Sequence, residues 1–180
     1  WQVLKIWGIP FKIHPYWIVL LFLFSWSISD QINLTANQTY NTQESWLIGF
    51  LTSFFLLSSI FLHQIFHTYI CLCEGVKIKN ITFFFLGAIL QVEKDCQTAL
   101  GNIKISLVRP ALCFITSFFL LSISGFTDSK EQILINIISR VGIFNLFLGF
   151  FNLIPVGKLD GGNLFKSIIW YISGNKNKGR

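Results

Sequence analysis

The sequence HQIFH at positions 63–67, within the apolar stretch WLIGFLTSFFLLSSIFLHQIFHTYICLC of residues 46–73, decides the fold and the chemistry expected of this chain. Histidines at this spacing lie on the same face of an α-helix, so His63 and His67 present two imidazoles one turn apart. That geometry suits one metal ion, and zinc sites with the pattern H-E-x-x-H use it with the glutamate as general base. Here the position after the first histidine is Gln64, whose amide cannot take a proton from a bound water. The pattern therefore predicts a metal site that lacks its catalytic base.

The composition indicates an integral membrane protein. The chain of 180 residues is 53% hydrophobic and only 12% charged, whereas a soluble domain carries about 25% charged residues. The net charge of +6 fits cytoplasmic flanks better than nucleic-acid binding, because no basic patch lies within a soluble fold. We therefore expect an all-α, multi-pass membrane protein with about five transmembrane or partial helices. The sequence leaves the oligomeric state open.

Apolar runs and the segments between them predict the order of the elements. Residues 1–15 alternate between apolar and polar around a Gly-Ile-Pro turn and predict an interfacial strand arm. Apolar helices are expected over residues 16–28, 46–73, 105–124 and 133–151, with a partial or re-entrant helix over residues 163–173. Residues 74–104 contain β segments at 78–85 and 88–93, too short to span as helices, which predict a cytoplasmic hairpin.

The histidine pair is expected near the cytoplasmic side of the bilayer. Residues 30–45 contain no Lys or Arg, which places this loop outside by the positive-inside rule. His63 lies about 25 Å along the helix from Trp46, at 1.5 Å per residue. Ionisable residues inside a membrane are costly and usually functional, which favours metal binding by His63 and His67 over chance. Haem ligation is disfavoured, because axial histidines usually come from different helices.

A metal held by two histidines needs a third ligand, and Asp160 is the best candidate. The segment NLIPVGKLDGG at 152–162 breaks its helix at Pro155 and at the glycines, so the Asp160 carboxylate can turn toward a neighbouring helix. Two histidines and one carboxylate leave a position for water, as in catalytic zinc sites. Arginines also occur in the expected helices. Arg109 is expected to snorkel to the interface, and Arg140 needs a partner or a water-filled cavity.

Together these features resemble the site-2 protease family of intramembrane zinc metalloproteases, peptidase family M50. The resemblance covers nearly the whole chain, as a single metalloprotease-like domain over residues 1–180, and its motifs are His63-x-x-x-His67, the hairpin, Asn152-Leu-Ile-Pro155 and Leu159-Asp160-Gly161-Gly162. It implies that His63, His67 and Asp160 bind Zn²⁺. It also implies that Asn152 positions the water or polarises the substrate carbonyl.

The activity implied by this resemblance is hydrolysis of transmembrane protein substrates in regulated intramembrane proteolysis. Such substrates are cut within or near the bilayer after local unwinding of their helices. The hairpin, at Phe84, Gly87 and Gln91, is a candidate edge for docking an extended substrate by strand addition.

Three residues depart from the family pattern. Gln64 stands where the family has its catalytic glutamate, and Phe66 and Arg109 stand where it usually has glycine. Gln64 alone suggests an engineered substitution, whereas three departures together suggest natural drift, and the sequence leaves both open. We expect a zinc-loaded protein of impaired activity. The alternative is a non-catalytic pseudoprotease that binds or sequesters transmembrane clients, and a channel or transporter ranks last because the number of spans is low.

Overall fold

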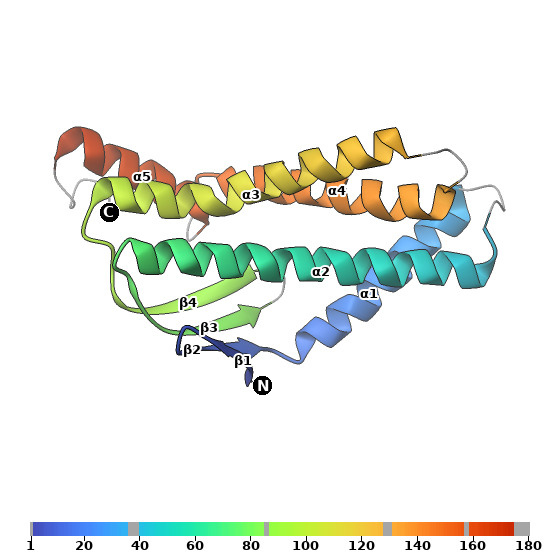
Figure 1. Cartoon of the computed structure of the whole chain (residues 1–180), viewed down its shortest axis with the longest axis horizontal. Coiled ribbons are helices and arrows are strands. Elements are labelled where there is room, and N and C mark those ends of the chain that lie inside the picture. The colour runs from blue at the N-terminus through green and yellow to red at the C-terminus, as the bar shows by residue number, and fades with distance from the viewer. Residues whose placement is uncertain (1, 36–39, 85–86, 128–130, 157–158, 175–180) are drawn as a thin grey trace.

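Five helices and a small mixed sheet make up the described part of the chain (Figure 1). The computed structural model describes residues 2–35, 40–84, 87–127, 131–156 and 159–174. The helices are α1 (Tyr16–Thr35), α2 (Thr42–Cys73), α3 (Ala99–Phe126), α4 (Gln132–Leu153) and α5 (Asp160–Ser173). The strands are β1 (Gln2–Ile6), β2 (Ile9–Ile13), β3 (Lys77–Phe84) and β4 (Gly87–Lys94).

Four of the described helices, α1 to α4, are long and apolar enough to cross a membrane. Helix α5 has only 14 residues, which is about 21 Å at 1.5 Å per residue and shorter than the roughly 30 Å hydrocarbon core. The expectation of several apolar helices followed by a shorter one is therefore confirmed.

Capping residues, rather than the apolar runs, set the starts of α2 and α3. Helix α2 begins before the expected residue 46, because Asn41 and Glu44 form a capping box in which each side chain accepts from the other residue's backbone N–H. Helix α3 likewise begins before residue 105, because the Thr98 hydroxyl accepts from the N–H of Gly101 at 3.1 Å. The helix expected from residue 105 would have Pro110 near its start, but the longer α3 has Pro110 in its interior.

The N-terminal arm and the hairpin belong to one sheet, with the strand order β1-β2-β3-β4. The sequence predicts each of them separately, and both are confirmed as strands. Their connection is not predicted: β2 pairs in parallel with β3, where Phe11 lies opposite Ile81 and Ile13 lies opposite Phe83. Strand β4 pairs only with β3 among the described strands and therefore forms an edge of the sheet.

The sheet packs against the helix that carries the histidines. In Figure 1, α2 runs between the sheet, below it, and helices α3 and α4, above it. Apolar side chains from the sheet, α1 and α2 share one buried cluster: Ile9, Phe11, Trp17, Leu20, Leu56, Leu57, Ile60, Ile81 and Phe83. Because Ile60 lies one turn before His63, this cluster supports the start of the histidine segment.

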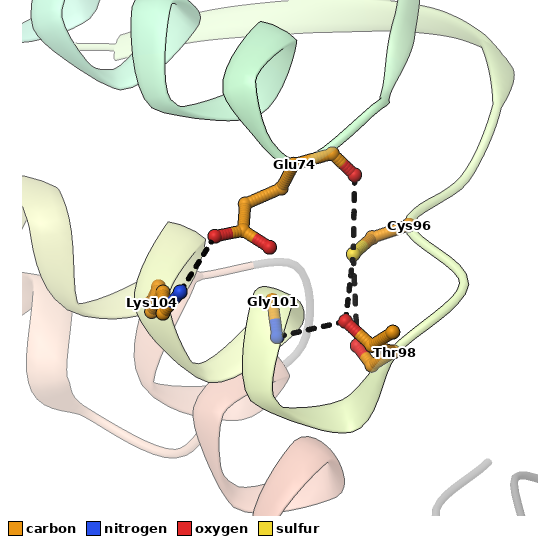
Figure 2. A network of polar contacts seen from close by, with 5 residues as sticks. All are labelled: Glu74, Cys96, Thr98, Gly101 and Lys104. Carbon is orange, nitrogen blue, oxygen red and sulfur yellow. Dashed lines mark hydrogen bonds and ion pairs between the residues drawn. The ribbon is translucent and has the colours of Figure 1, made fainter.

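A polar network joins the end of α2 to the start of α3 (Figure 2). Glu74 forms an ion pair of 2.9 Å with Lys104. The Cys96 sulfur lies 3.8 Å from the carbonyl oxygen of Glu74 and 3.6 Å from that of Thr98. A side chain at Gly101 would crowd Cys96, Glu74 and Thr98. The network therefore holds the end of α2 against the start of α3.

Polar side chains also connect α4 with α2 and with α1. Ser59 of α2 donates to Asn145 Oδ1 of α4 at 2.7 Å, and Asn145 Nδ2 donates to the carbonyl of Val141 at 2.8 Å. Arg140 of α4 donates to Gln31 Oε1 of α1 at 2.8 Å. The partner expected for Arg140 is therefore present, and it is an amide rather than an acid.

Candidate functional site

The two histidines lie on the buried face of α2, with His63 6% and His67 5% exposed. Both nitrogens of His63 face α3: Nε2 lies 3.1 Å from the Thr116 hydroxyl, and Nδ1 lies 3.5 Å from the Cys113 sulfur. His67 Nδ1 lies 3.8 Å from the sulfur of Cys71. The sequence predicts the shared histidine face, but not these partners on α3. Both nitrogens of His63 and Nδ1 of His67 thus have protein side chains as partners.

Gln64 occupies the position expected for the general base. Its side chain is buried, only 3% exposed, and its Nε2 donates to the Thr68 hydroxyl at 3.4 Å. It lines a cavity of about 40 Å³ together with His63 and Asn152. The structure therefore brings Gln64 and Asn152 to one cavity, although the catalytic roles assigned to them remain predictions.

Asp160 is the first residue of α5 and is 5% exposed. The start of α5 approaches the end of α4 so closely that a Cβ on Gly161 would collide with the backbone of Leu153. The Asp160 carboxylate faces Arg109, whose Nη1 lies 3.4 Å from each carboxylate oxygen. Burial raises the pKa of the Asp160 carboxyl above its ordinary value, and the Arg109 guanidinium opposes this shift.

Arg109 does not snorkel to the interface, so that expectation is wrong. Its side chain is only 20% exposed and pairs with Asp160 inside the protein. It lines the small cavity beside Gln64 and also a larger cavity of about 410 Å³, which it shares with His67 and Asp160. The physical reason is the early start of α3 at Ala99, which places Arg109 well inside the helix and within reach of a buried acid.

The expected zinc ligands do not form a metal-binding group in this arrangement. Within the described ranges, no set of three or more His, Cys, Asp or Glu side chains is placed to hold one ion. The Asp160 carboxylate is paired with Arg109, and both nitrogens of His63 have other partners. The residue types suit zinc, but their present contacts do not fit it.

The hairpin borders the larger cavity through strand β4. Phe84 and Gly87 pair with each other at the ends of β3 and β4, and the Gln91 side chain accepts from Asn80 Nδ2 at 2.9 Å. The β4 residues that line the cavity are Ala88, Ile89, Leu90 and Val92. Substrate docking at this edge remains a prediction, and its cavity-lining residues differ from those chosen from the sequence.

Comparison with known proteins supports the resemblance. The model of "Peptidase family M50" matches residues 122–180. The chain is 34% identical over 178 residues to "Putative zinc metalloprotease sll0528" of Synechocystis, and 30% identical over 171 residues to "Zinc metalloprotease MJ0392" of Methanocaldococcus jannaschii. These alignments cover 99% and 93% of this chain but 46% and 45% of the relatives. The chain thus spans a little under half the length of the curated relatives it matches.

A solved structure shows the same fold. The site-2 protease from Methanocaldococcus jannaschii superposes with a TM-score of 0.62 at 28% sequence identity, over 95% of this chain and 72% of that one. The similarity therefore includes the helices that carry the histidines and Asp160 as well as the sheet. Sequence and fold thus agree in their similarity to peptidase family M50 and to the site-2 proteases.

Proposed function

We propose that this chain is a site-2-protease-type membrane domain that binds transmembrane segments of protein substrates and whose hydrolysis of their peptide bonds is absent or strongly impaired. The observation that carries the proposal is the buried Gln64, which lines one cavity with His63 and Asn152. A carboxylate at this position can accept a proton from an attacking water, whereas an amide cannot. General-base catalysis contributes about 10²–10⁴-fold to a rate, so its loss leaves a strongly impaired site.

Strand β4 supports the assignment of the substrate. An extended segment can add to this edge through main-chain hydrogen bonds, with apolar pockets selecting its side chains. Ile89 and Val92 are 57% and 40% exposed, and both line the cavity that contains His67 and Asp160. A locally unwound transmembrane segment has both the apolar side chains and the free backbone that this edge accepts. The segment of residues 77–104, which contains the hairpin, carries several lysines. By the positive-inside rule this favours a location of the site near the cytoplasmic side of the membrane.

A second candidate function is non-catalytic binding of transmembrane clients. The ion pair between Arg109 and Asp160 favours it, because the carboxylate expected to hold a metal already has a cationic partner. Both candidates share the docking edge at β4 and differ in whether any bound client is cut.

Restoring the carboxylate tests the hydrolytic part of the proposal. The comparison is between Arg109→Ala and Arg109→Ala/Gln64→Glu in detergent, so that the two proteins differ only at position 64. We expect the double variant to cleave a fluorescent transmembrane peptide about 10²-fold faster or more. Gln64→Ala in the same background is the control and should give no gain. Equal rates for the folded glutamate and alanine variants would contradict the general-base account and favour the non-catalytic function.

Photo-cross-linking tests the substrate edge. A benzoylphenylalanine at Ile89 should cross-link a transmembrane peptide added in proteoliposomes. The matched control is the same group at Phe126, which is 92% exposed at the far end of α3. Equal yields at both positions would show non-specific contact and would exclude docking at β4.

A further inference from the structure

We propose that the Arg109 guanidinium is the resident cation of this site and that it keeps zinc out. The inference deepens the proposed function and rests on it, because it assumes that His63, His67 and Asp160 stand at the positions of the family's metal ligands. It predicts that the folded chain holds no zinc at these residues while Arg109 is present.

The first argument is the charge of Asp160. Its side chain is only 7% exposed, and a buried carboxylate requires a cation or a metal to compensate for lost hydration. Arg109 meets this need with one nitrogen placed equally, at 3.4 Å, from both oxygens. An arginine stays protonated at any pH a protein tolerates. The positive charge that Arg109 places beside the Asp160 carboxylate is therefore permanent, and no ion from solution is needed.

The second argument is the position of Arg109. It lines the small cavity with His63 and Gln64 as well as the larger cavity with His67 and Asp160. A divalent ion bound by these histidines and Asp160 would share a low-dielectric site with a fixed positive charge. Arg109 and the ion therefore compete for the same carboxylate and repel each other.

The third argument is that the histidines have partners that need no metal. His63 contacts Thr116 and Cys113 on α3, and His67 contacts Cys71 one turn further along α2. A metal would link the histidines of α2 to Asp160 of α5. In this structure Asp160 is linked to α3 instead, through Arg109. The polar contacts of the site are thus arranged around the arginine.

The test is the zinc content of the purified full chain, measured by mass spectrometry after equilibration with zinc in detergent and dialysis. The unmodified protein and Arg109→Lys, which keeps the charge, should hold less than about one tenth of a zinc ion per chain. Arg109→Ala should hold about one ion per chain, the stoichiometry of a three-ligand site. Arg109→Ala/Asp160→Ala should lose that ion again, by about tenfold in content or more.

Two results would overturn the inference. One is about one zinc ion per chain in the unmodified protein that is lost in His63→Ala. The other is a folded Arg109→Ala protein without zinc. If Arg109→Ala does not fold, Arg109→Gln takes its place, because it removes the charge and keeps most of the side chain. The proposed function is tested separately, since cross-linking at Ile89 does not depend on zinc content.

Discussion

Replacing Asp160 by alanine should destabilise the protein, because it leaves Arg109 as a buried charge without a partner. For unit charges 3.4 Å apart, Coulomb's law gives about 5 kcal/mol at an effective dielectric constant of about 20. One fifth of the Arg109 side chain is exposed, so water screens part of this attraction. We therefore expect the free energy of unfolding to fall by about 2–4 kcal/mol in Asp160→Ala.

The double variant Arg109→Ala/Asp160→Ala isolates the pair. It leaves neither charge buried, so its loss of stability should be smaller than the sum of the two single losses by about 2–3 kcal/mol. Unfolding is followed by circular dichroism during titration with SDS in mixed micelles. A metal chelator is present, so that bound zinc adds no stability to Arg109→Ala.

The surface ion pair between Glu74 and Lys104 provides the matched control. It is shorter, at 2.9 Å, but 65% of the Lys104 side chain is exposed. An exposed pair contributes about 0.2–1 kcal/mol, so its double-mutant cycle should give a smaller coupling than that of Arg109 and Asp160. A coupling below about 0.5 kcal/mol for Arg109 and Asp160 would show that the pair behaves like a solvated one and would refute the reasoning.

The packing of the helices gives two further predictions, both read by the same SDS titration. Gly49→Ala should cost about 1–3 kcal/mol, because its Cβ would collide with the backbone oxygen of Ser25 in α1. Gly125→Ala has open space around it and should change stability by less than about 1 kcal/mol; similar losses at both glycines would contradict the packing argument. Ser59→Ala should cost about 0.5–1.5 kcal/mol, because Asn145 Oδ1 loses its donor at 2.7 Å. An unchanged midpoint would mean that this hydrogen bond adds no stability.

The elements of the fold could be predicted because their signals are local. Runs of apolar residues indicate helices, and short alternating segments bounded by turns indicate strands. The starts of α2 and α3 were missed although local signals existed, since Asn41 with Glu44 fits a capping box and Thr98 is a residue type favoured at the N-cap. The apolar runs were weighted more heavily than the caps, and the predicted helices were therefore too short at their N-terminal ends.

The connections between distant segments could not be predicted from those signals. The parallel pairing of β2 with β3 joins residues that are far apart in the sequence, and no turn between them specifies it. The same limit applies at the site. The spacing of His63 and His67 follows from one helix, whereas the direction of Arg109 depends on where α5 places Asp160. An arginine near an expected helix end fits an interfacial position equally well until its partner is known.

Gln64 and Arg109 are better understood together than as separate departures from the family pattern. Both line the small cavity, and Arg109 already compensates the charge of Asp160. A glutamate at position 64 would place a second buried carboxylate beside that single guanidinium, and like charges in a shared low-dielectric site oppose ionisation. The neutral amide avoids this conflict. A site with ionised carboxylates at both position 64 and position 160 therefore requires a cation of higher charge than one arginine supplies. Because Arg109 is the cation that pairs with Asp160 in this chain, a neutral glutamine at position 64 has a physical reason.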